Sequence, residues 1–188
     1  VSVVIPTYRE KNSIHTAVQE VLATRVCDEL IVVSNNAEPG TREAVASTSA
    51  KWVEEPRQGY GFALQRGYAE ATGDLVLTLE PDGTFKGGDI IKLLAYAEDV
   101  DVVFGTRTSS AMIWSGANMG WFIRLGNFLV AKFMEFVFNT SILTDCGCTM
   151  KLLSRRAVDA LRPQFTVGGS HFSAELMLLA IVNGFRVI

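Results

Sequence analysis

The sequence lacks an apolar run long enough to cross a bilayer as a helix, which takes about 20 residues. The nearest candidate, residues 111–138, is interrupted by Arg124, Lys132 and Glu135. No stretch with the composition of a signal peptide comes before the first apolar segment, because Val1 already belongs to that segment. We therefore expect neither a spanning helix nor a secretory leader within these 188 residues.

Cysteine and net positive charge are also scarce. The 3 cysteines, Cys27, Cys146 and Cys148, lack the spacing of a four-ligand metal site, which favours reduced thiols in a cytosolic setting. The formal net charge of -3 argues against a nucleic-acid partner. Internal repeats and low-complexity linkers are absent from the sequence as well.

Hydrophobic residues make up 48% of the chain, which is enough to bury a substantial core within a single domain. Apolar runs rich in β-branched residues predict buried strands at 1–5, 29–33, 51–53, 74–79 and 101–105. Pro6 is expected to end the first strand, and Asn12 to cap the helix after it. Further helices are expected over 41–49, 59–71 and 89–97. This alternation predicts an α/β fold with a mostly parallel, doubly wound sheet and helices on both faces.

The alternation of strand and helix patterns ends after residue 105. We expect a loop over 106–120 and one or two amphipathic helices over 121–139. These helices carry the aromatic residues Trp121, Phe122, Phe128, Phe133, Phe136 and Phe138. A core helix explains such a pattern, and so does a helix lying on a bilayer, because aromatic rings interleaved with Arg and Lys suit headgroup depth. The final residues, 184–188, resemble the start of another strand, so we expect the natural chain to continue beyond them.

Two carboxylates directly follow a buried strand in the stretch TLEPDGTF, residues 78–85. Ligands of open α/β sheets bind beyond the carboxyl ends of the strands, where PTYRE (6–10) and SNNAEPGT (34–41) also lie. In an extended backbone Glu80 and Asp82 point the same way, and they repel each other unless a cation lies between them. Oxygen ligands suit Mg²⁺ or Mn²⁺ better than zinc. A solvated Asp-Gly turn is the alternative explanation.

The order VSVVIPTYRE, ELIVVSNNAEPGT and EPRQGYGFALQRGYAEATGDLVLTLEPDGTF resembles glycosyltransferase family 2, which has the GT-A fold. The later DVVFGTR and TDCGCTMKLLSRRAV resemble the branch of dolichyl-phosphate mannose synthase and bacterial polyprenyl-phosphate glycosyltransferases. The resemblance covers nearly the whole chain. It implies one catalytic domain over 1–188, with a nucleotide-sugar-binding half over 1–105 and an acceptor-binding half over 106–188.

The resemblance also implies roles for residues of the first half. The metal motif falls on Glu80, Pro81 and Asp82, with Asp82 a ligand and Glu80 reaching the metal, directly or through water, or contacting the nucleotide. The first nucleotide-binding loop falls on Pro6, Thr7, Tyr8 and Glu10. Arg57 to Gly61 matches a segment near ribose and diphosphate, where Gly59 allows close backbone approach.

The second loop departs from the family pattern of an acidic pair followed by Asp-Gly. Ser34, Asn35, Pro39 and Gly40 stand at the corresponding positions. Asn35 can still bind a base or ribose, but without charge. The identity of the nucleotide therefore stays open.

In the second half, Arg107 and Arg124 resemble residues that bind an acceptor phosphate, and Lys151 is a third candidate. For each of the three, a solvated surface charge is the alternative. Asp145 corresponds to a family acid near the reacting centre, as a base or as a residue that orients the acceptor; it could instead cap a turn. His171 and Glu175 are expected just before the last helix, in capping or core contacts rather than as a base.

Together these features predict an inverting, metal-dependent enzyme that moves a sugar from a UDP- or GDP-sugar to a polyprenyl or dolichyl phosphate at the cytoplasmic membrane face. One alternative is an enzyme that transfers the sugar to a saccharide hydroxyl. The other is a catalytically silent nucleotide-sugar binder, which the uncharged Ser34–Asn35 pair would favour. A dinucleotide-dependent oxidoreductase is disfavoured because GYG (59–61) lacks the third glycine of the motif.

Overall fold

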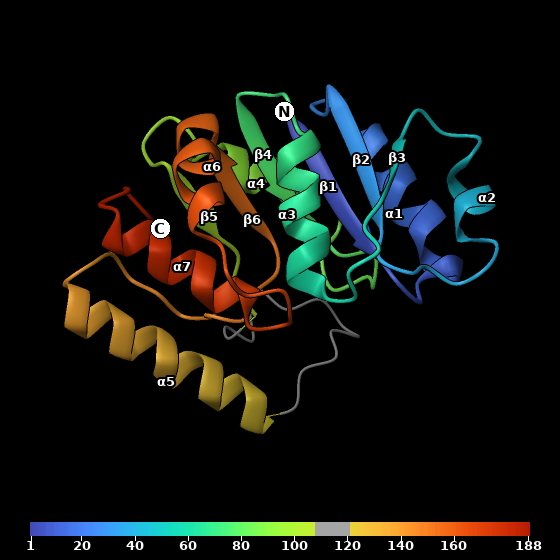
Figure 1. The fold of residues 1–188 in the computed structure, drawn as a ribbon. Coiled ribbons are helices and arrows are strands. Elements are labelled where there is room, and N and C mark those ends of the chain that lie inside the picture. The colour runs from blue at the N-terminus through green and yellow to red at the C-terminus, as the bar shows by residue number, and fades with distance from the viewer. Residues whose placement is uncertain (108–120) are drawn as a thin grey trace.

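In the computed structural model, which describes residues 1–107 and 121–188, a single sheet has the strand order β3-β2-β1-β4-β6-β5 (Figure 1). The strands are β1 (Ser2–Thr7), β2 (Glu29–Ser34), β3 (Lys51–Glu54), β4 (Leu75–Thr78), β5 (Val102–Phe104) and β6 (Lys151–Ser154). All run parallel except β6, which is antiparallel to β4 on one side and to β5 on the other. The predicted mostly parallel α/β sheet is confirmed.

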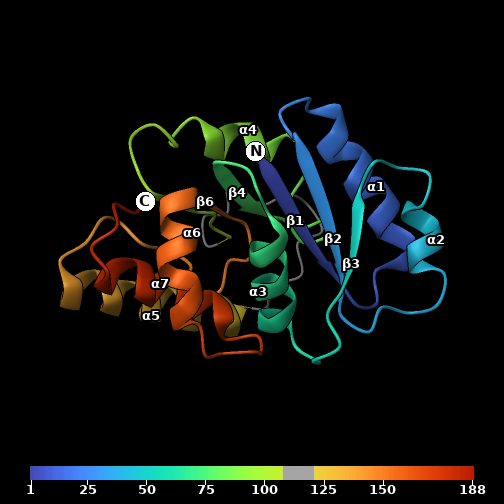
Figure 2. The same cartoon turned by 45° about the horizontal axis from the view of Figure 1, so that its top comes forward.

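Helices cover both faces of the sheet (Figures 1 and 2). The helices on one face are α1 (Lys11–Ala23), α2 (Thr41–Val45) and α4 (Asp89–Leu94). Those on the other are α3 (Tyr60–Glu70), α6 (Arg155–Leu161) and α7 (Phe172–Val182). Val3 and Ile5 of β1 pack into the first layer and Val4 into the second, as the two-residue period of a strand requires. The strands therefore form the centre of two hydrophobic cores.

The first strand continues through Pro6, where we expected it to end. Its pairing with β2 extends to Thr7, but its pairing with β4 stops at Val4. The Val4 carbonyl oxygen accepts a hydrogen bond from Leu79 N, so the backbone groups of Val4 are directed toward β4. Those of Pro6, two residues further along β1, are directed the same way, but they lie beyond the last β1–β4 pair. Proline therefore removes no hydrogen bond from the sheet at this position.

Helix boundaries differ from the expectations in three places. Helix α1 begins at Lys11 and not after a cap at Asn12; Glu10 occupies the cap position. Its apolar face, with Ile14, Val18 and Val21 buried, is as expected. Helices α2 and α4 end at Val45 and Leu94, several residues earlier than expected.

Two features of the second half were not foreseen in detail. Strand β6 was not predicted, because KLLS is short and lies between loop and helix without a clear alternation. The terminal segment contributes a single parallel bridge between Val187 and Val102, rather than a strand of its own. The loop expected over 106–120 falls almost entirely outside the described residues.

Helix α5 (Trp121–Phe138) is one continuous helix that packs beside α7 at the margin of the fold (Figures 1 and 2). Only Ala131 and Met134 of its 18 residues are buried. Among the described residues, no helix combines the length and apolarity needed to span a bilayer.

Candidate active site

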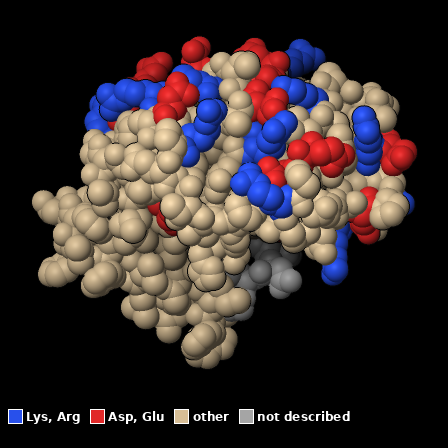
Figure 3. Space-filling view, in the orientation of Figure 1, with Lys and Arg blue, Asp and Glu red and all other residues tan. Residues whose placement is uncertain are grey.

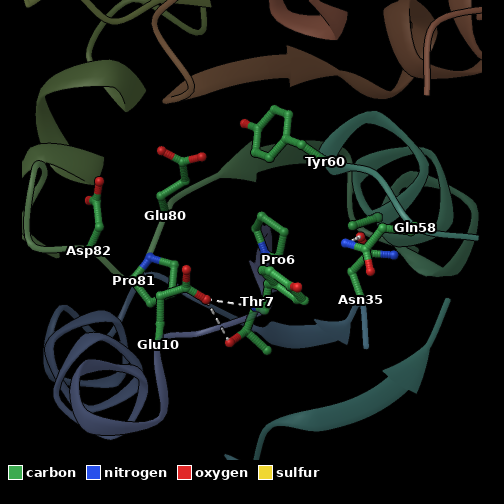
Figure 4. Close-up of a pocket in the computed structure, with 11 residues that line it drawn as sticks. Pro6, Thr7, Glu10, Asn35, Gln58, Tyr60, Glu80, Pro81 and Asp82 are labelled. Carbon is green, nitrogen blue, oxygen red and sulfur yellow. Dashed lines mark hydrogen bonds between the residues drawn. The ribbon is translucent and has the colours of Figure 1, made fainter. Parts of the chain in front are cut away.

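The strand-end loops meet at one cleft, as the sequence predicted (Figure 4). It lies at the carboxyl ends of β1, β2 and β4, beside the first turn of α3. Its lining residues are Pro6, Thr7, Tyr8, Glu10, Asn35, Gln58, Tyr60, Ala63, Glu80, Pro81 and Asp82. In Figure 4 the acidic pair lies on one side of the cleft, and Asn35 and Gln58 lie on the opposite side.

Glu80 and Asp82 both line this cleft, and their side chains point the same way in Figure 4. Asp82 also closes a turn, because its Oδ1 and Oδ2 accept from the backbone N and Oγ1 of Thr84, each at 2.8 Å. The Asp-Gly turn weighed as an alternative therefore exists. It does not prevent metal binding, because each carboxylate oxygen keeps a further lone pair.

The surroundings of Glu80 fit a divalent cation. Burial, and next the negative charge of Asp82, raise the pKa of Glu80 from 4.5 to about 7. A cation between the two carboxylates would supply the missing opposite charge. Within residues 1–107 and 121–188 no group of three or more His, Cys, Asp and Glu side chains could hold a metal. Mg²⁺ or Mn²⁺ bound here would therefore complete its coordination with water or substrate oxygens, as these ions commonly do.

The raised pKa of Glu80 predicts how the stability of the metal-free protein depends on pH. Between about pH 4.5 and 7 the folded chain keeps a proton that the unfolded chain has lost, so stability falls as pH rises through this window. E80Q removes the ionisation. We expect it to exceed the unaltered protein in stability by about 1–3 kcal/mol at pH 8, and to match it at pH 4, in urea unfolding with EDTA. A stability difference that does not change with pH would contradict this assignment.

Glu10 organises the first loop. Its Oε2 accepts from Thr7 Oγ1 (3.1 Å) and from the backbone N of Tyr8 (2.6 Å) and of Arg9 (2.9 Å). The Tyr8 ring stays exposed at the cleft, with the Arg9 guanidinium 4.8 Å from its centroid. The Tyr8 ring is therefore accessible for the predicted packing on a nucleotide base.

Arg57 and Gly59 lie in the expected segment but not among the cleft-lining residues. The Nε and Nη2 atoms of Arg57 bind Glu55 at 2.9 and 3.1 Å, and its guanidinium lies over the Phe62 ring. Gly59 has φ +150°, and a Cβ there would come within 2.2 Å of the Gly168 carbonyl oxygen. Glycine is thus required for contact with another loop of the chain.

The candidate acceptor residues are distributed over several elements. Asp145 is buried, and its Oδ2 accepts from the backbone N (3.0 Å) and Nε (3.1 Å) of Arg107. Its Oδ1 accepts from Gly147 N at 3.1 Å. Arg124 lies half-buried in the first turns of α5. Arg107 and Asp145 are therefore one unit, linking the end of β5 to the loop before β6.

Lys151 is not a solvated surface charge, since it is fully buried in β6. Its Nζ donates to the Cys148 carbonyl oxygen and lies over the Phe104 ring, and burial lowers its pKa to about 8. Its charge and that of Arg107 both act on Glu80. Lys151 lies inside the fold and is not among the residues that line the cleft.

Glu175 lies within the first turn of α7, not before it. Its Oε1 accepts from the backbone N and Oγ1 of Thr166, at 2.9 and 2.6 Å, and its two carboxylate oxygens accept from Val167 N. His171 occupies the N-cap position without a side-chain capping bond. Glu175 thus holds the loop before α7, which is neither the helix cap nor the core contact that we expected.

Sequence reasoning missed Gln58, Tyr60 and Ala63 as cleft residues. In Figure 4 the Tyr60 hydroxyl is directed toward the Glu80 side of the cleft. Burial, and next the charge of Glu80, raise the pKa of Tyr60 well above 10. The segment RQGYG was noticed, but which of its side chains face the cleft depends on how α3 packs on the sheet.

Comparisons with known proteins agree with this geometry. The family model described as Glycosyl transferase family 2 matches residues 2–162. An uncharacterized glycosyltransferase of Mycobacterium tuberculosis is 32% identical over 132 residues, which cover 70% of this chain and 57% of that protein. The undecaprenyl-phosphate 4-deoxy-4-formamido-L-arabinose transferase of Aeromonas hydrophila is 28% identical over 174 residues, covering 86% and 51%. The chain thus spans about half the length of these relatives.

Solved structures share the fold. Glucosyl-3-phosphoglycerate synthase from Mycobacterium tuberculosis, in complex with Mn²⁺, UDP and glucosyl-3-phosphoglycerate, superimposes with a TM-score of 0.76 at 17% identity. The match covers 97% of this chain and 65% of that one.

Proposed function

Because the chain belongs to glycosyl transferase family 2, we propose that it transfers a sugar from a UDP- or GDP-sugar to a polyprenyl phosphate, with inversion. The observation that carries this proposal is the acidic pair Glu80 and Asp82 on the wall of the strand-end cleft. A relative named for an undecaprenyl-phosphate acceptor supports the acceptor class, and a neighbour bound to UDP and Mn²⁺ supports the donor class.

The donor would lie across the cleft. Glu80 and Asp82 would hold a divalent cation, which supplies Lewis-acid stabilisation to a leaving diphosphate. Glu10 keeps the loop after β1 in place, so that Tyr8 offers its ring to the base. Tyr60, directed toward Glu80, lines the cleft on the α3 side.

The Arg107–Asp145 unit favours a phosphate acceptor over a sugar hydroxyl. A hydroxyl nucleophile needs a base to take its proton, whereas a phosphate is already anionic and needs mainly placement. Both oxygens of Asp145 accept hydrogen bonds, from Arg107 and from Gly147, so it is better suited to orient Arg107 than to abstract a proton. Arg107 donates to Asp145 through its backbone N and its Nε. The two terminal guanidinium nitrogens of Arg107 take no part in this pair, and a phosphate can bind them.

Helix α5 supplies the proposed contact with the membrane. In Figure 3 the charged side chains gather over the sheet and its helices, while the region over α5 is almost free of charge. Its most exposed apolar residues are Trp121, Phe122, Ile123, Phe133 and Phe136. Exposed apolar surface of this extent marks an interaction site. We place the protein peripherally at the cytoplasmic face of a membrane, where a lipid-linked acceptor is available.

The proposal predicts where labelled sugar will be found. With Mn²⁺, UDP- or GDP-sugars labelled in the sugar and bilayers containing polyprenyl phosphate, label is expected in the organic-extractable lipid. Label confined to water-soluble glycan would instead support a saccharide acceptor. Nucleotide binding without turnover on any acceptor would support a silent binder. Omitting the polyprenyl phosphate is the control.

A further inference from the structure

The side-chain amide of Asn35 has no hydrogen-bonding capacity left for a ligand. Its Nδ2 donates to the carbonyl oxygens of Glu55 (3.0 Å) and Arg57 (2.7 Å). Its Oδ1 accepts from Gly59 N (2.8 Å) and Gln58 Nε2 (3.2 Å). Since an amide has two N–H donors and two acceptor lone pairs, all four positions are filled. Only 3% of the residue is exposed.

Gln58 keeps the capacity that Asn35 has lost. Its Nε2 donates to Asn35, and its Oε1 accepts from Asn36 Nδ2 at 2.8 Å. Each bond uses one of two positions, so one donor and one acceptor remain on an exposed side chain that lines the cleft. The two neighbouring amides hold this side chain in place. The Gln58 amide can thus hydrogen-bond a ligand in the cleft, and its two existing bonds fix its orientation.

The place of Gln58 in the cleft indicates which part of a nucleotide it meets. The acidic pair, where a diphosphate and its cation would bind, lies on one side of the cleft in Figure 4, and Gln58 lies on the other. A nucleotide whose diphosphate is at Glu80 and Asp82 would therefore extend its base toward Gln58.

We propose that Gln58 reads the base of the nucleotide and that Asn35 acts as the positioning residue beneath it. This inference rests on the proposed function for the presence of a nucleotide in the cleft. A neutral amide offers a donor and an acceptor side by side, which matches the adjacent N–H and C=O groups of uracil or guanine. On this side of the cleft the base would be recognised by the neutral amide of Gln58 and not by a charged side chain.

The same contacts favour asparagine over an acid at position 35. The carbonyl oxygens of Glu55 and Arg57 need donors, and an ionised aspartate has none. In N35D, carboxylate oxygens would face these two carbonyl oxygens. The segment 55–59 would move away from the end of β2 and take Gln58 with it.

Calorimetric titration with UDP, GDP and pyrophosphate, each with Mn²⁺, tests the assignment. We expect Q58A to weaken binding of the preferred nucleoside diphosphate about threefold to tenfold, the effect of one or two neutral hydrogen bonds, and to leave pyrophosphate binding unchanged. For N35D we expect a loss of at least about tenfold, with the KM for the sugar donor raised and kcat unchanged. The exposed pair Gln164 and Asn183 provides a matched control, since their amides bond each other at 3.2 Å; N183D should change neither value.

The outcomes separate this inference from the proposed function. If the unaltered protein binds nucleoside diphosphates and Q58A binds them equally well, or if Q58A weakens pyrophosphate as much as UDP, the role of Gln58 is wrong while the proposed function stands. If the unaltered protein binds no nucleoside diphosphate, both are wrong. N35D with unaltered nucleotide affinity and KM would overturn the positioning role of Asn35.

Discussion

Replacing Asp82 by asparagine is expected to lower sugar transfer at least about a hundredfold, the size of loss seen when one preorganised group that stabilises transition-state charge is removed from an active site. Asparagine keeps the turn, because its Oδ1 can accept from Thr84 N and its Nδ2 can donate to Thr84 Oγ1. It removes the negative charge that, with Glu80, would hold the cation. The variant therefore separates the turn from the metal site.

Three measurements on D82N check this expectation: the rate of sugar transfer, its dependence on Mn²⁺ concentration, and the unfolding temperature. We expect the first to fall, the second to weaken and the third not to fall, because the repulsion between Asp82 and ionised Glu80 is lost. D99N, at an exposed acid just after α4, is the matched control and should change none of them. Full activity of D82N with unaltered Mn²⁺ dependence would show that the metal lies elsewhere.

Charge on the outer face of α5 is expected to release the protein from lipid vesicles. Phe133 and Phe136 are 67% and 86% exposed, so aspartate at both positions leaves the core untouched. Burying a phenylalanine in an apolar phase contributes about 1.5–3 kcal/mol, and partial insertion about half of that. We expect F133D/F136D to weaken vesicle binding at least about tenfold in a sedimentation assay with anionic lipids.

The control for this experiment is I91D, since Ile91 is also an exposed apolar residue, 53% accessible, but on α4. It should bind vesicles like the unaltered protein. Transfer to a short-chain, water-soluble polyprenyl phosphate should survive in F133D/F136D, because the cleft residues are unchanged. Vesicle binding equal to that of the unaltered protein would mean that α5 faces another part of the polypeptide or another protein.

Several parts of the fold could be predicted because they depend on neighbouring residues. Strands such as ELIVV are recognisable from their β-branched composition, and the apolar face of α1 from its spacing. Strand β6 could not be recognised, because four residues carry almost no periodic signal and its place between β4 and β5 depends on distant partners. The position of Pro6 inside β1 likewise depends on where β4 stops pairing.

The candidate site divides in the same way. Glu80 and Asp82 were found because two acids after a buried strand are visible in the sequence. Gln58 was missed because its direction depends on hydrogen bonds to Asn36 and Asn35, 22 and 23 residues away. Tyr60 was missed because its direction depends on how α3 packs in the fold. Burial was also invisible in advance: Lys151 has the sequence context of a surface lysine, but it lies inside the sheet.

The sequence by itself determined the order of the strands and helices other than β6, and the presence of acids at strand ends, because periodicity and turn composition act between residues close along the chain. Only the tertiary structure decided which polar atoms remain available to a ligand. The amide of Asn35 is filled by groups 20 to 24 residues away, and Asp145 is held by Arg107, 38 residues away. Hydrogen-bonding capacity is shared across the fold, so the function of a polar side chain depends on partners that folding brings to it.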